Sequence, residues 1–300
     1  MFKVFIFFDL ALLSYNQNPT TSPAFFYPKT PGITFLTTHQ QAYEKMMPFD
    51  YTFMIPGTIL YYGLSSIVAH NFYSEKHRQL LQTFTRPFVT PTAAIPSART
   101  TQFDSSLFNL FGVKYLVFAP GKAPADLDLT RFRSVYKGDD LDIFENSDYK
   151  GAAFLVKKVA IVKIPELMLS KLADRAFNPY EEAYVEEDIT SSLPQHSAAL
   201  EVLPENSVTI SAYNSNNVTY QVASSQDNFL VTAELFYPGW KAFVDGKETT
   251  IYRANYIFRG VVVPAGQHEV TFIFAPFSFR LGVIISGLSL LLMSVYLLFY

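Results

Sequence analysis

Histidine is the residue type in this chain best suited to metal binding or proton transfer, and it occurs five times. None of the five histidines has a short spacing such as His-Glu-x-x-His, which places two ligands on one face of a helix. They are His39, His70, His77, His196 and His268. The chain contains no cysteine, which excludes disulfides, thiolate metal sites and a cysteine nucleophile. We therefore expect no metal site and no bound cofactor.

Carboxylate side chains gather in two places. Paired carboxylates are the minimum for much glycoside chemistry, and three lie close together: Asp139, Asp140 and Asp142. Residues 137–140 read Lys-Gly-Asp-Asp, which is typical of a hairpin turn where Asp bonds to nearby backbone, so we interpret these carboxylates as turn residues. The second group lacks the Asp/Asn alternation and the Gly of a calcium loop, which favours a solvated acidic face. It consists of Glu181, Glu182, Glu186, Glu187 and Asp188.

The remaining chemical motifs do not make a complete active site. The sequence has no phosphate-binding G-x-x-x-x-G-K and no G-x-S-x-G around a serine nucleophile. The single Trp240 and the many tyrosines could stack on sugar rings. Trp240 alternates with Ala242 and Val244 at strand spacing, however, which favours packing in a core.

The composition indicates a folded protein with a covered apolar surface. A chain of 300 residues is long enough for two domains, each with its own core. Charged residues make up 16% of the chain, below the roughly 25% of soluble domains, and aromatic residues also reach 16%. Lipid or protein must therefore cover part of the surface. The net charge of -3 argues against a nucleic-acid partner.

The C-terminal segment, residues 281–300, is predicted to be a transmembrane helix. Its twenty residues carry no charge, and as a helix they rise about 30 Å, the thickness of the hydrocarbon core. Twelve of them are Leu, Ile, Val or Phe, worth about -4 to -7 kcal/mol of insertion free energy. The lipid bilayer is therefore an expected partner, with Arg280 at the interface on the entering side.

Small residues in this helix allow a close neighbour. Gly282 and Ser286 stand one turn apart, a spacing that lets another transmembrane helix approach. The alternative interpretation is that small residues are simply tolerated in lipid.

The N-terminal segment, residues 1–13, is apolar but too short to span a membrane. Lys3 followed by apolar residues resembles a signal peptide. Asp9 in the middle and the lack of a small-residue cleavage site argue against that interpretation. We favour the end of a membrane helix whose beginning is missing.

The fold predicted between these ends is an α+β domain followed by an antiparallel β-sandwich. Residues 14–34 are rich in Pro, Thr, Ser and Asn, which predicts an extended loop. The α+β domain covers residues 35–197, with a helix capped by Ser74, a helix at 107–111 closed by Gly112, and a helix opened by Pro165. Its strands are expected at 114–118, 132–137, 141–145 and 152–162.

The predicted sandwich covers residues 198–278, where short apolar runs alternate with turn signals. The turns are marked by residues 214–217, by Asp245 and Gly246, and by Ala265 and Gly266, which tolerate positive φ. Strands are expected at 207–213, 217–224, 229–236, 240–244, 248–252, 256–263 and 268–275.

The order of motifs in the sandwich region is typical of one family. The motif residues are Tyr237, Pro238, Gly239, Trp240, Asp245, Gly246, Lys247, Pro264, Gly266 and His268, and Pro276 precedes the last helix. Upstream, residues 107–117 and 142–146 match the family's helix-to-strand element and next strand. Over nearly its whole length the chain resembles the C-terminal part of the YfhO-like bacterial membrane proteins, which are grouped with the GT-C class of polytopic glycosyltransferases. Because Pro238, Gly239, Asp245, Gly246 and Gly266 bend or reverse the backbone, we interpret these residues as a structural motif.

The resemblance implies an activity and a location. Proteins of this class are understood to move a sugar from a polyprenyl-phosphate donor onto a cell-envelope acceptor on the outer face of the membrane. Their catalytic acid lies in an early loop of a multi-helix N-terminal module. This chain does not contain that module, so no catalytic residue is assigned. The expected partners are the bilayer, the helices of that module and a cell-envelope glycan, with the bulk of the chain outside the cytoplasm.

Two hypotheses of different classes follow. In the first, the chain is the extracytoplasmic domain and last helix of a YfhO-like glycosyltransferase, inactive without the membrane module. In the second, it is a membrane-anchored scaffold or carbohydrate-binding protein with no catalytic activity. An upstream reading frame with many hydrophobic segments supports the first hypothesis, and an isolated gene with a genuine signal peptide supports the second.

Overall fold

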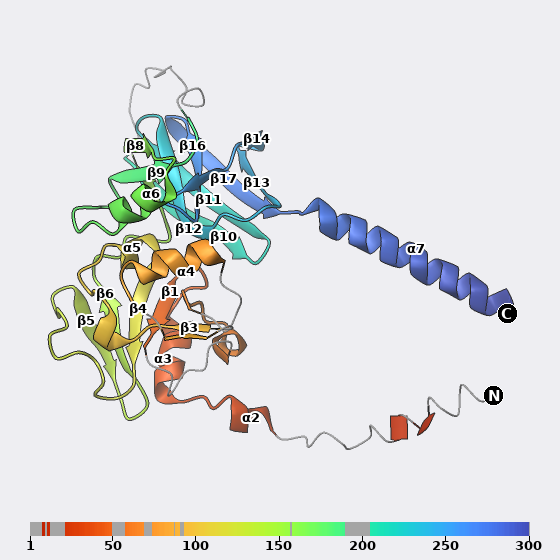
Figure 1. Ribbon diagram of the computed structural model, residues 1–300, viewed down its shortest axis with the longest axis horizontal. Helices are drawn as coiled ribbons and strands as arrows, with labels where there is room; N and C mark the ends of the chain where they lie inside the picture. The colour runs from red at the N-terminus through yellow and green to blue at the C-terminus, as the bar shows by residue number, and fades with distance from the viewer. Residues whose placement is uncertain are drawn as a thin grey trace.

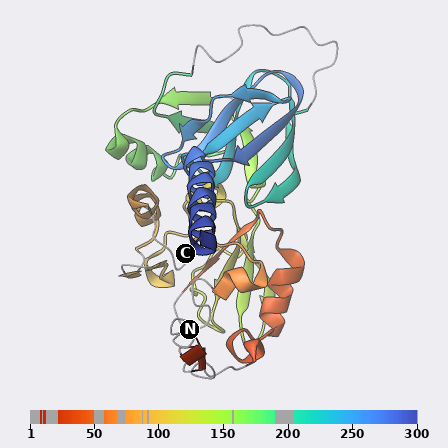
Figure 2. The same ribbon diagram turned by 90° about the vertical axis from the view of Figure 1, so that its right-hand side faces the viewer.

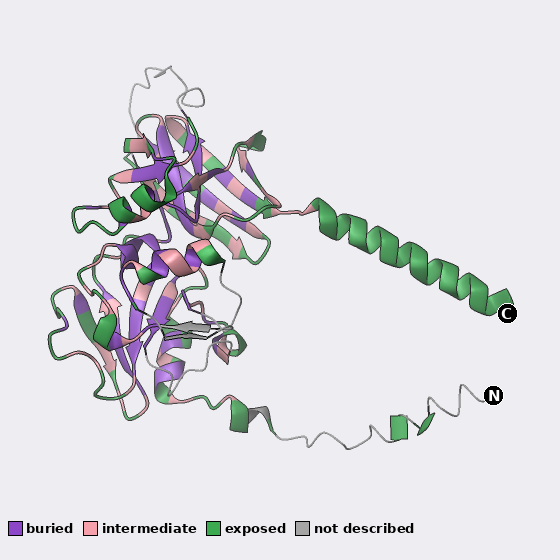
Figure 3. Cartoon of the chain, viewed as in Figure 1, coloured by how far each residue is buried: buried purple, intermediate pink, exposed green. Residues whose placement is uncertain are grey.

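The computed structural model describes residues 8–9, 11–12, 22–49, 58–68, 74–86, 88–90, 93–156, 158–189 and 205–299. The chain forms two stacked lobes, and helix α7 (Phe277–Phe299) extends away from them (Figure 1). Buried residues concentrate on the sheets of both lobes, whereas α7 is exposed along its length (Figure 3). The fold is mixed α and β, as predicted. Most of the apolar segment at residues 1–13 lies outside the described residues.

The lower lobe in Figure 1 is built on a four-stranded sheet in the order β1-β4-β6-β5. Strand β1 is parallel to β4, and the other neighbours are antiparallel. The strands are β1 (Lys45–Pro48), β4 (Val113–Phe118), β5 (Phe132–Lys137) and β6 (Asp142–Asn146). Smaller elements complete the lobe: α2 (Pro23–Phe26), η1 (Thr58–Tyr62), the hairpin β2 (Phe88–Thr90) and β3 (Ala93–Ile95), and η2 (Ala98–Thr100).

Strand β4, in the interior of this sheet, buries side chains on both of its faces. Tyr115 and Val117 pack in the cluster that contains the apolar residues of α3 (Pro31–His39). Leu116 and Phe118 belong to a second cluster, with apolar residues of α4 (Glu75–Gln82) and α5 (Leu107–Leu110). Successive strand residues point to opposite faces, so a near-continuous apolar run is what a strand covered on both sides requires.

The upper lobe is a sandwich of two sheets, which confirms the predicted β-sandwich. One sheet has the order β10-β11-β17-β13-β14 and the other the order β7-β12-β16-β15-β9-β8. Apart from the parallel pair β8 and β9, all neighbours are antiparallel. The strands are β7 (Ala153–Val156), β8 (Lys158–Ile161), β9 (Glu182–Val185), β10 (Ser207–Asn214), β11 (Asn217–Ser224), β12 (Asn228–Leu235), β13 (Trp240–Val244), β14 (Lys247–Thr249), β15 (Tyr252–Ala254), β16 (Phe258–Val263) and β17 (Gly266–Phe274), and α6 (Pro165–Leu172) lies between β8 and β9 in the chain.

Apolar residues of the two sheets meet in a single cluster. Val218, Tyr220 and Phe272 come from the five-stranded sheet, and Leu230 and Val261 come from the six-stranded sheet. The alternation predicted for residues 217–224 is confirmed, because Val218, Tyr220 and Val222 are buried on one face.

Both edge strands of the five-stranded sheet, β10 and β14, are irregular or short. Edge strand β10 carries a bulge, because its register against β11 shifts between Ile210 and Ala212. The opposite edge, β14, has only three residues and exposes Lys247 and Glu248. Both features limit the length of regular, unpaired backbone at the sheet edges.

The six-stranded sheet recruits strands from before residue 198. Strand β7 pairs with β12, matching Val156 with Phe229, and β9 pairs with β15. Hydrogen bonding therefore crosses the expected division between residues 35–197 and 198–278. The division into two domains stays a prediction.

Two predicted strands are each split in two. The strand predicted at residues 248–252 is divided between the two sheets. Glu248 and Thr249 end β14 in the five-stranded sheet, and Tyr252 begins β15 in the six-stranded sheet. Residues 152–162 form β7 and β8, which lie at opposite edges of the six-stranded sheet. Strand propensity is the same in either sheet, so the pattern does not reveal where the chain crosses between partners.

The sequence signals for the ends of helices agree with the structure better than the strand patterns do. The Ser74 hydroxyl accepts a hydrogen bond from the His77 backbone N–H at 3.2 Å, as a helix N-cap does. Gly112 follows α5 with a φ of +72°, and Pro165 is the first residue of α6. Of the predicted loop at residues 14–34, the structure describes residues 22–34, which are less extended than predicted, because Thr30 caps α3 and Pro31 opens it.

An aromatic contact lies where the cores of the two lobes meet. The rings of Phe111, after α5, and Phe258, in β16, meet edge to face with centroids 5.2 Å apart. Both rings belong to one hydrophobic cluster that extends from α4 to β16. The lobes therefore share a core and are held in a fixed relation.

Helix α7 is the element, among the described residues, that is long and apolar enough to cross a membrane. It begins four residues before the predicted start at Leu281. None of its residues is buried by the rest of the chain, which fits a helix that lipid surrounds.

The buried His77 on α4 makes stability depend on pH. Burial, and next the nearby Lys45 cation, lower the pKa of His77 from 6.5 to about 4. Between these two pH values the unfolded chain binds a proton at His77 that the folded chain excludes. The contribution of His77 to the free energy of unfolding is therefore complete above about pH 6.5, and it falls by up to about 3 kcal/mol as the pH approaches 4.

The matched variants are His77→Gln and His39→Gln, since His39 is exposed. Urea unfolding of the micelle-embedded protein at about pH 7 and about pH 4.5 measures the difference in free energy. We expect His77→Gln to reduce the pH dependence and His39→Gln to leave it unchanged. An equal pH dependence in His77→Gln and the parent protein would contradict this explanation.

Candidate functional site

The motif residues Tyr237, Pro238, Gly239 and Trp240 lie where the sandwich meets α7. Gly239 has a φ of +103°, and its carbonyl accepts a hydrogen bond from the Ala275 N–H at 2.9 Å. A Cβ at this position would lie 2.9 Å from the Cβ of Pro276. Only glycine fits here without strain, so this part of the motif fixes the chain just before α7.

Trp240 is half-buried and packs against the core of the sandwich, in agreement with its alternation. Its ring lies 5.3 Å from the ring of Phe274, and the Arg259 guanidinium carbon stands 3.9 Å above it. Arg259 is 2% exposed, and its nearest carboxylate is Glu234 at 3.9 Å. The aromatic face and Glu234 together compensate a buried cation. Sequence reasoning missed this group, because Arg259 sits in an ordinary strand pattern.

The motif residues Asp245, Gly246, Gly266 and His268 form a second group at the other end of β13 and β17. Asp245 Oδ2 contacts His268 Nδ1 at 2.7 Å, and its Oδ1 accepts from the Glu269 N–H at 2.9 Å. The His268 contact is the largest cause that lowers the pKa of Asp245. Gly246 and Gly266 both have positive φ.

Lys247 and Pro264 line a recess of about 530 Å³ next to this second group. Trp240 pairs with Phe274, and Val244 pairs with Val270, so β13 and β17 connect the two motif groups. The ten motif residues therefore lie in two separate places, and their contacts are those of a scaffold. Their assignment as a structural motif stays a prediction.

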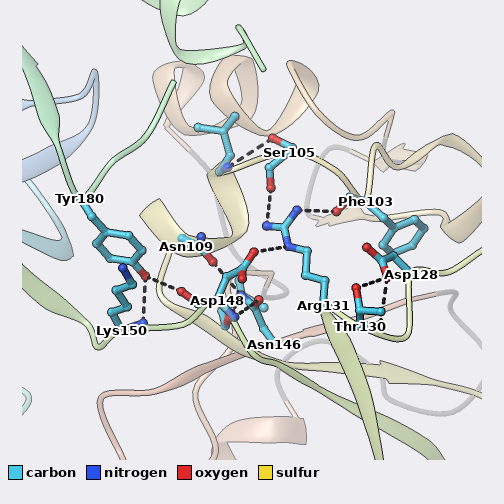
Figure 4. A network of polar contacts seen from close by, with 12 residues as sticks. Phe103, Ser105, Asn109, Asp128, Thr130, Arg131, Asn146, Asp148, Lys150 and Tyr180 are labelled. Atoms are coloured by element: carbon cyan, nitrogen blue, oxygen red, sulfur yellow. Dashed lines mark hydrogen bonds and ion pairs between the residues drawn. The ribbon is translucent and has the colours of Figure 1, made fainter. Parts of the chain in front are cut away.

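A polar pocket, which we call the Arg131 pocket, lies near the boundary of the lobes and has a volume of about 280 Å³. Its lining residues are Asp104, Ser106, Asn109, Arg131, Asp148, Lys150, Phe177, Asn178 and Tyr180. Figure 4 shows the polar contacts around it. None of these residues was a candidate from the sequence, because they come from four separate segments.

Arg131 forms one wall of the pocket and is held on three sides (Figure 4). Its Nη1 and Nη2 donate to the carbonyls of Phe103 and Ser105, both at 2.8 Å. Its Nε lies 3.1 Å from Asp148 Oδ2. These fixed partners define the position of the guanidinium before any ligand arrives.

Tyr180 forms the opposite wall. Its hydroxyl accepts from the Lys150 N–H at 2.9 Å and donates to the Asp148 carbonyl at 3.2 Å. The Lys150 ammonium lies 5.1 Å from the centre of the Tyr180 ring. Burial raises the pKa of Tyr180 to about 12, so the phenol is protonated at neutral pH and serves as a hydrogen-bonding group.

The chemistry of the pocket is suited to binding. Its charged residues balance, with Arg131 and Lys150 against Asp104 and Asp148. Asp104 pairs with Arg175 at 3.0 Å, as Asp148 does with Arg131, so both carboxylates are held in ion pairs. Amide, hydroxyl and aromatic groups beside balanced charges fit an uncharged, hydroxyl-rich ligand.

The predicted turn is present, since the Gly138 N–H donates to the Leu141 carbonyl at 3.0 Å, but Asp140 and Asp142 bond mainly to groups distant in the chain and not to nearby backbone as predicted. Asp140 Oδ2 accepts from the Gly32 N–H at 2.7 Å, and its Oδ1 accepts from the Tyr136 hydroxyl at 2.8 Å. Asp142 is buried, and its Oδ2 accepts from the Gly121 N–H at 2.8 Å. These hydrogen bonds stabilise backbone and occupy the carboxylates.

The acidic run and the histidines show no metal centre in the part of the chain that the structure describes, where no three His, Asp or Glu residues converge. Glu186 pairs with Lys76 at 2.8 Å and with Arg253 at 3.4 Å. His70 and His196 lie outside the described residues.

The two-sheet sandwich, the flanking α/β lobe and the exposed α7 define a membrane protein with a large folded domain beside one C-terminal apolar helix. Residues 191–286 match the family described as "Bacterial membrane protein YfhO". This match confirms, over residues 191–286, the resemblance to the YfhO family of bacterial membrane proteins.

A curated relative matches part of the chain. It is 29% identical over 85 residues to a protein described as "Uncharacterized protein YfhO" from Bacillus subtilis (strain 168). The matched region makes up 28% of this chain and 10% of that protein. No solved structure matches this chain significantly.

The crowding at Gly239 predicts an unequal effect of two alanine substitutions. Gly239→Ala combines positive φ with the Pro276 contact and should lower the free energy of unfolding by about 2–4 kcal/mol. Gly246→Ala also has positive φ, but nothing lies within 4 Å of its Cβ, so about 1 kcal/mol is expected. Urea unfolding in micelles measures both variants. Equal losses would show that Pro276 does not restrict this position.

Proposed function

We propose that this chain is the extracytoplasmic portion of a polytopic glycosyltransferase-like membrane protein, which moves a sugar from a polyprenyl-phosphate donor to a cell-envelope acceptor. The observation that carries the proposal is the YfhO-family match over residues 191–286, which ends within α7. The folded domain is thus tied directly to a membrane-embedded element. In this proposal other transmembrane helices pack beside α7, where Gly282 and Ser286 allow a close approach.

The contribution of the folded domain is to hold the acceptor. The Arg131 pocket supports this role, because hydroxyl groups of a glycan can exchange hydrogen bonds with Asn109, Asn178 and Asp104. The Tyr180 ring offers an apolar face for a sugar ring. The catalytic acid belongs to the membrane module, since both pocket carboxylates are already paired with arginines.

The second candidate is a membrane-anchored scaffold or carbohydrate-binding protein without catalytic activity. The observation that favours it is the Arg131 pocket itself, whose groups are arranged for hydrogen bonding and not as a nucleophile with a base. The two candidates differ in whether sugar transfer depends on the chain. Deletion of the gene abolishes incorporation of radiolabelled sugar into the envelope under the first candidate and leaves it unchanged under the second.

The proposed orientation can be tested with single cysteines, because the chain contains none. Leu129 is 63% exposed on the lower lobe. We expect Leu129→Cys to react with a membrane-impermeant maleimide in intact cells, and Leu290→Cys, within α7, to stay unlabelled. Labelling of Leu129→Cys only after the cells are permeabilised would place the domain in the cytoplasm and overturn the proposal.

The acceptor-holding role can be tested by titrating the purified full chain with a neutral hexose oligosaccharide. Lys150→Ala removes a cation that lines the pocket and should weaken binding about tenfold, the equivalent of one hydrogen bond to a charged group. Lys122→Ala is the matched control, since Lys122 is exposed outside the pocket. Equal affinity of Lys150→Ala and Lys122→Ala would rule out the pocket as the binding site.

A further inference from the structure

The lower lobe exposes a group of large apolar and aromatic side chains, which we call the aromatic surface. Its most exposed members are Phe25 at 82%, Leu60 at 70%, Phe26 at 68% and Tyr61 at 55%. They come from α2 and η1, more than thirty residues apart in the chain. Folded proteins seldom leave such groups in water unless another surface covers them.

The aromatic surface is ordered by contacts among its own rings. Tyr27 stacks on Tyr61 with ring centroids 4.0 Å apart and an interplanar angle of 14°. Tyr61 in turn meets Tyr62 edge to face at 5.5 Å. The Tyr62 hydroxyl donates to the Pro28 carbonyl at 2.9 Å, which ties η1 to the segment after α2. These contacts hold the aromatic side chains in a defined arrangement on the lower lobe.

The position of the aromatic surface relative to α7 indicates what covers it. Figure 1 shows α2 at the edge of the lower lobe, on the side toward which α7 extends, and Figure 2 views the molecule from this side. The base of α7 also exposes aromatic rings: Phe277 is 76% exposed, Phe279 70% and Tyr237 65%. A bilayer that receives α7 therefore lies on the same side as both aromatic groups.

We propose that the aromatic surface lies in the headgroup region of the bilayer that α7 enters, and gives the domain a second attachment to the membrane. Aromatic residues, Tyr above all, are enriched at this level because their rings are apolar and their hydroxyls bind water or headgroups. Lys29, three residues after the end of α2, is exposed and suits anionic lipid phosphates. The surface contacts lipid whichever side of the membrane the domain occupies, so the inference is independent of the proposed function.

Lipid fits this surface better than a second copy of the chain. Attachment through α7 holds the lobe beside the bilayer at all times, whereas a second copy must first be encountered. The aromatic surface also faces the same side of the molecule as the aromatic residues at the base of α7, where α7 enters the membrane. Two attachment points would restrain the swing of the domain about the short link between β17 and α7.

The experiment uses single-cysteine variants of the full chain in phosphatidylcholine–phosphatidylglycerol vesicles. Leu60→Cys reports on the aromatic surface, and Leu167→Cys is the matched control, because Leu167 is 45% exposed on α6, away from α7 in Figure 1. Each cysteine carries an environment-sensitive fluorophore. Quenching is measured with a headgroup-labelled nitroxide lipid and with aqueous iodide.

We expect lipid quenching about threefold greater at Leu60 than at Leu167, since aromatic belts lie at headgroup depth, and iodide quenching lower at Leu60. Adding Phe25→Ser and Phe26→Ser to Leu60→Cys should return lipid quenching to the Leu167 level. Equal lipid quenching at the two positions would overturn the proposal. Shielding of Leu60 from iodide without lipid quenching would also overturn it, because the surface would then contact a second copy of the chain.

Discussion

The hydrophobic core shared by the two lobes, in which Phe111 meets Phe258, is the constraint on which the arrangement of the molecule depends. Each ring is almost fully buried in its own lobe, and their edge-to-face packing makes one hydrophobic core out of two. The Arg131 pocket lies near this boundary of the lobes, and its lining residues come from both of them. The shared core also relates the aromatic surface to α7, because these two features belong to different lobes.

Buried charge provides a second restraint of a different kind. The Arg259 guanidinium lies over the rings of Trp240 and Phe272, and Glu234 pairs with it. Glu234 also lies 3.5 Å from Lys45 at the start of β1, so one carboxylate connects the sandwich with the lower lobe. An unpaired buried ion is costly, and each member of the group therefore constrains the others. The tryptophan of the family motif thus has a role that reaches beyond its own strand.

Features that depend on neighbours in the chain could be predicted from the sequence, and features that depend on distant segments could not. Ser74, Gly112 and Pro165 mark helix ends because a cap or a positive φ is decided within a few residues. The step from β14 to β15 was missed, since strand propensity carries no information about the partner sheet. The Arg131 pocket was missed for the same reason. The sequence does show an arginine after Asp128 and Thr130, but only folding brings Phe103, Ser105 and Asp148 to it.

The irregular edges of the five-stranded sheet matter more for an anchored protein than for one free in solution. Anchoring confines chains to two dimensions with a common orientation, so strand edges of neighbouring molecules meet repeatedly at the same height. A long, regular edge would then add strand after strand into an aggregate. The bulge in β10 and the short, charged β14 interrupt that growth at both ends. Dense packing in a membrane is thereby compatible with a β-rich domain that stays monomeric along its edges.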